Sequence, residues 1–218
     1  PGQVTAIIGS TGSGKSALIN LIPRFYDVDK GSILIDGVDV RELSQETLRG
    51  KIGFVPQKAQ LFSGTISENI RFGNEKISAE EIRHAADIAQ AREFIDSFDE
   101  GFEHLITQGG TNVSGGQKQR LSIARALARK PEVYIFDDSF SALDFKTDAK
   151  LRAALKREIV EETVIIVAQR VGTVMDADNI IVLDKGQIAG MGTHKELLAA
   201  NGVYREIVES QLSEEEIA

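Results

Sequence analysis

Apolar residues occur along this chain in two alternating patterns. Short runs such as Val133-Tyr134-Ile135-Phe136 and Val164-Ile165-Ile166-Val167 are apolar at every position, which is typical of strands buried on both faces of a parallel sheet. We predict strands at 4–8, 32–35, 52–55, 133–136, 164–168, 180–183 and 187–190. Helix-like segments separate these runs. The pattern therefore predicts an α/β fold with a mainly parallel sheet.

The middle of the chain, at about 61–116, lacks strand runs of this buried kind. Its apolar positions follow a helical spacing instead, through Ile82, Ala85, Ala86, Ile88 and Ala89. We therefore expect an α-helical subdomain at about 61–116, inserted into a sheet core formed by about 1–60 and 117–218.

Local signals mark some element ends. Ser78 with Glu81, and Thr193 with Glu196, have the spacing of capping boxes and predict that helices begin there. The acidic stretch Ser213-Glu214-Glu215-Glu216 is expected to be a frayed tail.

The chain of 218 residues carries a net charge of −8 and no cysteine, and 42% of its residues are hydrophobic. This size and apolar content are enough for a full buried core. The acidic balance argues against a nucleic-acid groove, because neutralising phosphates needs clustered Lys and Arg. Without cysteine there is no disulfide and no thiolate metal site. The sequence also lacks an apolar run of about 18 residues, which is the signal for a membrane-spanning helix.

One glycine-rich stretch carries the most specific chemical signal. It fits the pattern G-x-x-x-x-G-K-[ST], between a predicted strand and a predicted helix, and reads Gly9-Ser10-Thr11-Gly12-Ser13-Gly14-Lys15-Ser16. Glycines let backbone N–H groups turn inward around a phosphate, and the following helix points its positive end at the same anion. Lys15 would reach the β- and γ-phosphates, and the Ser16 hydroxyl would hold Mg²⁺. The alternative, a flexible Gly/Ser loop, leaves the flanking strand and helix unexplained.

Two carboxylates follow the apolar run at 133–136. Asp137 comes at the carboxyl end of a predicted strand, where ligands of open α/β sheets bind, and is a candidate for the Mg²⁺ shell. Asp138 is the candidate to orient or deprotonate an attacking water. Any strand can end in Asp, so this pattern gains its meaning from the phosphate loop.

A second anion-type site is expected at Ser114-Gly115-Gly116-Gln117, which leads into a predicted helix at 121–129. The serine hydroxyl, the free N–H groups and the helix dipole would all favour an anion at this helix start. A plain helix cap is the alternative. Two phosphate sites do not easily close on one nucleotide within a compact monomer, so we expect this one to face a nucleotide held by another subunit.

The motifs and their order resemble the nucleotide-binding domain of an ABC transporter. In order, they are the stretch Gly9 to Ser16, Gln57 in Val55-Pro56-Gln57, Ser114 to Gln117, Ile135-Phe136-Asp137-Asp138, and Ser141-Ala142-Leu143-Asp144. The resemblance covers essentially the whole chain. Within the family, the stretches 61–70 and 192–198 are similar to those of multidrug and lipid exporters.

This resemblance implies a P-loop NTPase (RecA-like) core with an inserted α-helical subdomain, and an ATPase that uses ATP and Mg²⁺. It implies a head-to-tail dimer in which each ATP lies between one subunit's phosphate loop, including Ala17, and the other subunit's stretch Ser114 to Gln117. Gln57 would sense the γ-phosphate and join Ser16 and Asp137 at the metal, while the stretch Ser141 to Asp144 would touch the opposite subunit. The partners would be a second such domain and an exporter's transmembrane domain, at the cytoplasmic face of the cell membrane. We also expect upstream strands and the transmembrane part to belong to a longer protein.

Four positions depart from the family's pattern. Asp138 stands where members that hydrolyse ATP well have Glu, and Gln169 stands where they have His; Ala17 replaces a usual hydroxyl and Val113 a usual Leu. Shortening Glu to Asp withdraws the carboxylate by about 1.5 Å, and a misplacement of about 1 Å can cost on the order of 100-fold in rate. Gln169 donates a hydrogen bond but has no titratable proton. Harmless drift is the alternative for Asp138 and for Gln169, and the coincidence of these two substitutions at one site favours impairment.

Two hypotheses follow from these departures. In the first, the chain is the motor of an exporter, with a slow own site and an intact Ser114 stretch lent to a non-identical partner. In the second, it is a nucleotide-gated dimerisation module with negligible hydrolysis of its own. A soluble ABC protein acting on DNA or ribosomes is a more distant alternative, and the exporter-like stretch at 61–70 argues against it.

Overall fold

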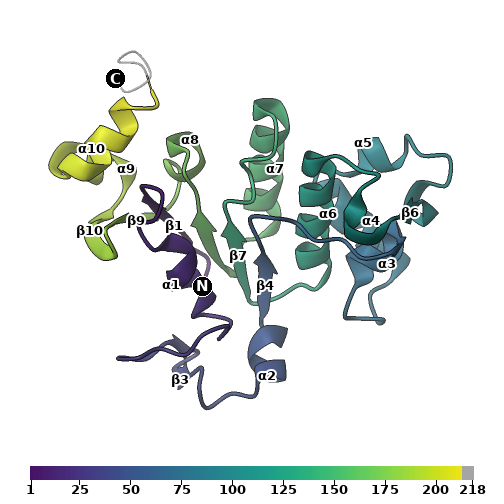
Figure 1. The fold of residues 1–218 in the computed structure, drawn as a ribbon, viewed down its shortest axis with the longest axis horizontal. Helices are drawn as coiled ribbons and strands as arrows, with labels where there is room; N and C mark the ends of the chain where they lie inside the picture. Colours follow the sequence, from purple (N-terminus) through teal and green to yellow (C-terminus); the bar gives the residue numbers. More distant parts are fainter. Residues whose placement is uncertain (213–218) are drawn as a thin grey trace. The chain divides into compact units, whose positions relative to one another are not determined.

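The computed structural model describes residues 1–212, and the chain divides into two compact units (Figure 1). The first unit comprises Pro1–Ile52, Glu132–Asp138 and the chain from Glu162 onward. The second comprises Gly53–Pro131 and Ser139–Glu161. The expected acidic tail from Ser213 to Glu216 lies outside the described residues.

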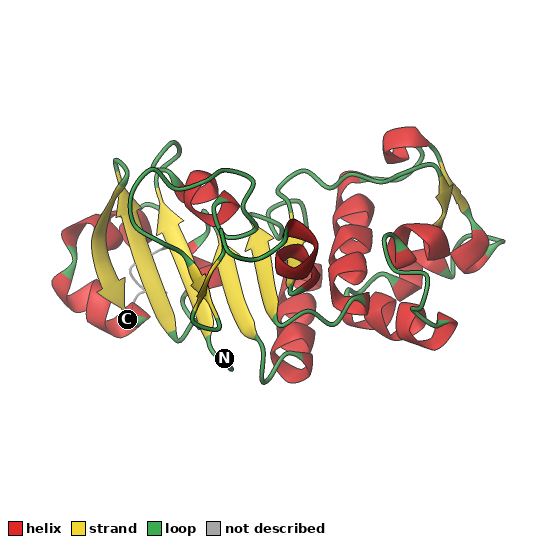
Figure 2. Ribbon diagram, turned by 90° about the horizontal axis from the view of Figure 1, so that it is seen from below, coloured by secondary structure: helices red, strands yellow, loops and turns green. Residues whose placement is uncertain are grey.

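The first unit is built on a mainly parallel sheet, drawn in yellow in Figure 2. Its strands follow the order β10-β9-β1-β8-β7. β1 lies parallel to both β8 and β9, β7 lies parallel to β8, and only β10 runs antiparallel to its neighbour β9. These strands are β1 (Val4–Gly9), β7 (Val133–Asp137), β8 (Thr163–Val167), β9 (Asn179–Asp184) and β10 (Gln187–Gly192). The predicted α/β class with a mainly parallel sheet is confirmed.

Burial explains why the apolar runs form these strands. Ile8, Ile135, Phe136, Ile180 and Val182 are all fully buried, as expected of strands covered on both faces. The predicted strands begin or end within one or two residues of the observed ones.

The strand predicted at 32–35 is shorter in the structure, where it begins two residues later and ends at the predicted residue. The structure has a hairpin there, formed by β2 (Leu34–Ile35) and β3 (Val38–Asp39), which pair antiparallel. Asp36 and Gly37 form its two-residue loop with φ of 52° and 78°. Asp-Gly favours such turns because both loop positions need positive φ.

Within residues 1–212, the helices of the first unit are α1 (Lys15–Asn20), α2 (Gln45–Gly50), α8 (Val171–Val174), α9 (His194–Ala200) and α10 (Gly202–Glu209). α9 begins with the predicted capping box of Thr193 and Glu196. α10 is anchored by Tyr204 and Val208, both fully buried, and the Tyr204 hydroxyl lies 2.7 Å from Nδ1 of His194.

The second unit is mainly helical. Its helices are α3 (Ile66–Arg71), α4 (Ala79–Ile88), α5 (Arg92–Ile95), α6 (Gly115–Ala128) and α7 (Phe145–Glu158), with 3₁₀ turns at Gly101–Glu103 and Gln108–Gly110. β5 (Gly64–Thr65) pairs antiparallel with β6 (Leu105–Ile106), and β4 (Ile52–Val55) crosses the boundary between the units. The predicted capping box of Ser78 and Glu81 opens α4.

This unit is larger than the expected subdomain at 61–116. α6 packs against α3 and α4, and α7 contacts α4, so both helices belong with this unit. Across residues 1–212, no helix combines the length and apolar character that crossing a membrane requires.

Candidate functional site

The glycine-rich loop connects β1 to α1 and is closed around a lysine. Lys15 Nζ donates to the carbonyl oxygens of Gly9 at 2.7 Å and Ser10 at 2.8 Å, so its ammonium lies inside the loop. Gly12 and Gly14 have φ of 81° and 99°, a region that side chains disfavour. A Cβ at Gly9 would collide with the carbonyl oxygen of Leu183 in β9. The pattern of glycines therefore has a steric cause at each position.

The first turn of α1 follows this loop and has no side-chain cap. Gly14 is the N-cap and has no side chain to take up the first N–H groups of the helix, while Ser16 and Ala17 in the first turn are exposed. The turn between β9 and β10 braces the loop, since Gly186 N–H donates to the Ser13 carbonyl at 3.1 Å. Unsatisfied N–H groups at a helix start favour an anion.

Ser16 and Asp137 meet beside Lys15. Ser16 Oγ donates to Asp137 Oδ1 at 3.1 Å, although the residues are 121 positions apart in the chain. A hydroxyl and a carboxylate are hard oxygen donors, which suit Mg²⁺ that also binds phosphate oxygens and water. Burial raises the pKa of Asp137, and the hydrogen bond from Ser16 opposes that rise. Burial also lowers the pKa of Lys15, against the charges of Asp138 and Asp137.

Asp138 and Gln169 form a second polar contact at the carboxyl ends of β7 and β8. Gln169 Nε2 donates to Asp138 Oδ2 at 3.1 Å, and Asp138 N–H donates to the Val167 carbonyl at 2.8 Å. Asp138 is largely buried, with φ of 45°. A non-glycine residue held in this region is uncommon and concentrates at functional sites. Two of the four positions that depart from the family's pattern, Asp138 and Gln169, therefore touch each other.

In the second unit, Ser114 is the N-cap of α6. Its Oγ accepts from Gln117 N–H at 3.2 Å, and Gln117 Oε1 accepts from Ser114 N–H at 2.8 Å, which completes a capping box. Ser114 and Gly115 are exposed. The expected helix start at 121 is six residues too late, because α6 already begins at Gly115.

The stretch from Ser141 to Asp144 lies against the start of α6. A Cβ at Gly116 would lie 3.3 Å from the Ala142 carbonyl oxygen, so a glycine permits this close approach. Leu143 is buried, whereas Ser141 and Ala142 are exposed. Asp144 caps α7 by accepting from Thr147 N–H at 3.0 Å, and this bond lowers the pKa of Asp144.

Gln57 is an exposed residue of the second unit. The two residues before it, Val55 and Pro56, have backbone carbonyls that accept hydrogen bonds from buried side chains. Gln119 Nε2 donates to the Pro56 carbonyl at 3.2 Å, and Ser139 Oγ donates to the Val55 carbonyl at 2.9 Å. Gln119 is 2% exposed and Ser139 is 0% exposed. Sequence reasoning missed both supporting residues; a polar residue among the apolar positions of α6 was the available signal.

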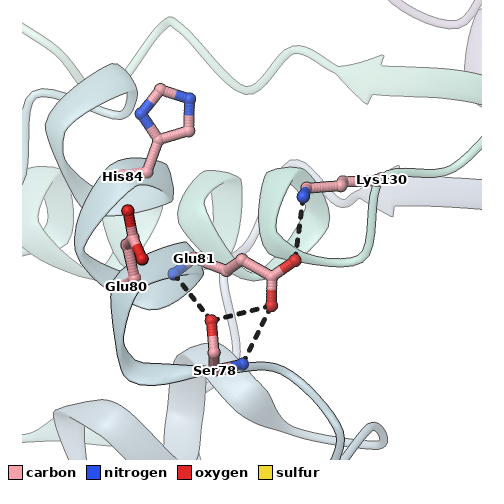
Figure 3. A pocket seen from close by; sticks show the side chains of 5 residues that line it. All are labelled: Ser78, Glu80, Glu81, His84 and Lys130. Atoms are coloured by element: carbon pink, nitrogen blue, oxygen red, sulfur yellow. Dashed lines mark hydrogen bonds and ion pairs between the residues drawn. The ribbon is translucent and has the colours of Figure 1, made fainter.

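A surface hollow of the second unit is separate from these motifs (Figure 3). It is lined by Ser78, Glu80, Glu81, His84 and Lys130. Lys130 Nζ pairs with Glu81 Oε1 at 2.8 Å and lowers the pKa of Glu81 to about 2. His84 pairs with Glu158 at 2.7 Å. Among residues 1–212, no group of three or more His, Asp or Glu is arranged to hold a metal.

The structure thus gathers the site residues in two sets. The loop from Gly9 to Ala17, Asp137, Asp138 and Gln169 belong to the first unit, and Gln57, the Ser114 stretch and the Ser141 stretch belong to the second. A family model described as ABC transporter matches residues 1–141. The chain belongs to the ABC transporter family.

Relatives of this ABC transporter domain are longer proteins. An ABC transporter ATP-binding protein of Mycobacterium tuberculosis is 49% identical over 214 residues, which cover 97% of this chain and 36% of that protein. One of Bacillus subtilis is 48% identical over 99% of this chain and 37% of its own length. The mitochondrial potassium channel ATP-binding subunit of Mus musculus is 46% identical over 96% of this chain and 29% of its length. The chain spans about a third of the curated relatives it matches.

A solved structure has the same fold. A bacterial Atm1-family ABC exporter with ATP bound superposes with a TM-score of 0.94 at 38% sequence identity, covering 98% of this chain and 37% of that one. The P-loop NTPase fold of the ABC domain, predicted from the motifs, is confirmed by this likeness.

Proposed function

We propose that this ABC transporter domain binds Mg-ATP and is the motor domain of an exporter, on the cytoplasmic face of the membrane. The single observation that carries the proposal is the cluster of Lys15, Ser16 and Asp137 at the glycine-rich loop. The likeness to an Atm1-family exporter with ATP bound supports it, as do relatives named ATP-binding proteins.

The proposed site assigns a task to each group. The first N–H groups of α1 and the Lys15 ammonium would hold the β- and γ-phosphates, and the pair of Ser16 and Asp137 would hold Mg²⁺. When bound, Mg²⁺ neutralises charge that develops on the phosphate oxygens. The exposed hydroxyl of Ser114 and the start of α6 would contact the ATP of a partner domain, with the Ser141 stretch beside them.

Hydrolysis at this chain's own site would be slow. Asp138 is one carbon shorter than Glu, and Gln169 already donates a hydrogen bond to its Oδ2 at 3.1 Å. A carboxylate that accepts from a fixed amide is a weaker acceptor for an attacking water. The Gln169 amide has no titratable proton with which to assist the reaction. We therefore propose a heterodimer with a non-identical partner that supplies the stronger hydrolytic groups.

A second candidate function is a regulatory module that closes the dimer on ATP with negligible hydrolysis of its own. The same contact between Gln169 and Asp138 favours it. The two proposals differ in own-site turnover alone, because both need ATP to be bound between two domains.

ATP binding is tested by Lys15→Ala. The variant removes a charge-assisted contact to the phosphates and should weaken Mg-ATP binding by about 10- to 100-fold. Isothermal titration calorimetry measures the affinity, and Lys195→Ala, on the exposed face of α9 in the same unit, is the matched control. Unchanged affinity in Lys15→Ala would contradict the site assignment.

A further inference from the structure

The segment after α10 reaches the backbone on both sides of Arg170. Gln211 Nε2 donates to the Gln169 carbonyl oxygen at 2.8 Å, and Gln211 Oε1 accepts from Val171 N–H at 2.9 Å. One carboxamide thus uses both of its ends on the loop between β8 and α8, 40 to 42 positions earlier in the chain. The geometry matches the donor and acceptor of glutamine to one carbonyl and one N–H.

Gln211 follows a helix that two buried side chains anchor. Tyr204 and Val208 of α10 are both fully buried, and the Asn201 side chain caps the helix by accepting from Tyr204 N–H at 2.8 Å. Gln211 N–H in turn donates to the Val208 carbonyl at 3.0 Å. The carboxamide therefore extends from a fixed point of the first unit.

The same loop touches the nucleotide site on its other side. Ala168 N–H donates to the Ile7 carbonyl of β1 at 3.2 Å, and the Gln169 side chain donates to Asp138. The backbone at 168–171 is consequently held by β1 at one end and by Gln211 at the other, while Asp138 accepts from the Gln169 side chain. Two hydrogen bonds thus link the end of β7 to the segment after α10: the Gln169 side chain donates to Asp138, and the Gln169 backbone carbonyl accepts from Gln211.

We propose that Gln211 is a positioning residue. By holding the Gln169 backbone it fixes the Gln169 side-chain amide at the nucleotide site, and it thereby couples α10 to bound ATP. The inference rests on the proposed function, because Gln169 acts on ATP only if ATP binds beside it. Coupling between two sites is reciprocal. ATP that orders the loop at 168–171 therefore also orders α10 and Gln211, and displacement of α10 loosens the hold on ATP.

The contact itself is tested by amide hydrogen exchange at Val171 in the complete protein that carries this chain. Gln211→Ala removes the acceptor and should speed exchange at Val171, by about fivefold for one ordinary hydrogen bond. Gln211→Glu keeps an acceptor oxygen for Val171 but cannot donate to the Gln169 carbonyl, so it should keep most of this protection. Unchanged exchange in Gln211→Ala would overturn the proposed contact.

The coupling is tested by the release of the fluorescent analogue mant-ATP with Mg²⁺, measured by stopped flow. Gln211→Ala should speed release about threefold to tenfold, Gln211→Glu should give a smaller increase, and Gln187→Ala on exposed β10 is the matched control. In a Gln169→Ala background the effect of Gln211→Ala should largely vanish, because the amide that it positions is gone.

Two results separate the possible failures. Faster Val171 exchange with unchanged mant-ATP release, or an equal effect in both backgrounds, would overturn the positioning role and leave Gln211 with a structural one. Failure of the proposed function has another signature: Lys15→Ala would bind mant-ATP as the wild type does, while Val171 exchange would still respond to Gln211→Ala.

Discussion

In the first unit, the loop that holds Lys15 and the strand end that carries Asp138 lie at carboxyl ends of parallel strands, yet they are built differently. The loop depends on the backbone: glycines at positive φ, two carbonyls around one ammonium, and an uncapped helix start. The contact between Asp138 and Gln169 depends on the ends of two side chains. Substitution can therefore change the groups proposed for hydrolysis while the backbone proposed to bind phosphate stays intact.

The same comparison extends to the second unit. Ser114 caps α6 with the same capping box that Ser78 provides for α4. The two serines differ in their surroundings: Ser114 lies at the start of a glycine-rich turn beside the Ser141 stretch, and Ser78 lines the hollow with Lys130 (Figure 3). An ordinary capping role and a nucleotide-contacting role can thus be separated by experiment.

The largest effect is expected from Ser114→Ala in the assembled transporter. Loss of a hydroxyl contact to the partner's ATP should lower total ATPase activity by about 10- to 100-fold. Asp138→Ala should cause only a small fraction of that loss, because it removes a group that contributes little turnover. Steady-state ATPase assays compare the two variants.

Ser78→Ala is the matched control for Ser114→Ala. Both variants lose an N-cap, which costs about 1 kcal/mol of stability, so thermal unfolding should shift similarly in both. ATPase activity should fall only in Ser114→Ala. The reverse order of Ser114→Ala and Asp138→Ala would mean that this chain's own site carries the turnover.

A gain of turnover is expected from Asp138→Glu combined with Gln169→His. The longer carboxylate recovers about 1.5 Å of reach, and the imidazole supplies a titratable group, so own-site turnover should rise by about tenfold or more. The assay needs a dimer whose opposing Ser114-type stretch is sound. Unchanged turnover in such a dimer would show that these two residues do not cause the slow hydrolysis.

Gln169→His alone provides a control with its own signature. Imidazole titrates near pH 6.5, so the variant should acquire a pH dependence of own-site turnover around that pH. Gln169 has no proton to lose in this range and should show none. The same pH profile in both proteins would indicate that position 169 does not act on the reaction.

Local patterns predicted much of the fold and of the geometry at the proposed phosphate site. Continuous apolar runs predicted the parallel strands, because burial on both faces leaves no polar position. Glycine spacing with a flanking strand and helix predicted the loop around Lys15, and the strand end predicted the place of Asp137. Each of these signals lies within a short stretch of sequence, so it can be recognised without knowledge of the tertiary structure.

Contacts between distant segments could not be predicted in this way. Gln169 and Asp138 are 31 positions apart, Gln211 and Gln169 are 42 apart, and Ser139 and Val55 are 84 apart. Such pairs depend on strand order and helix packing rather than on periodicity. The hairpin loop at Asp36 and Gly37 is a different case, because its local turn signal was present and was overlooked.

The proposed division between holding ATP and hydrolysing it is tested most directly by the nucleotide that each site keeps during turnover. In the assembled transporter, radiolabelled Mg-ATP would be supplied, turnover stopped by rapid quenching, and the bound nucleotide separated into ATP and ADP. We expect about one of the two bound nucleotides to remain ATP over many turnovers, and Asp138→Glu with Gln169→His to convert it to ADP. Conversion of all bound ATP at a single rate in the wild type would contradict this account.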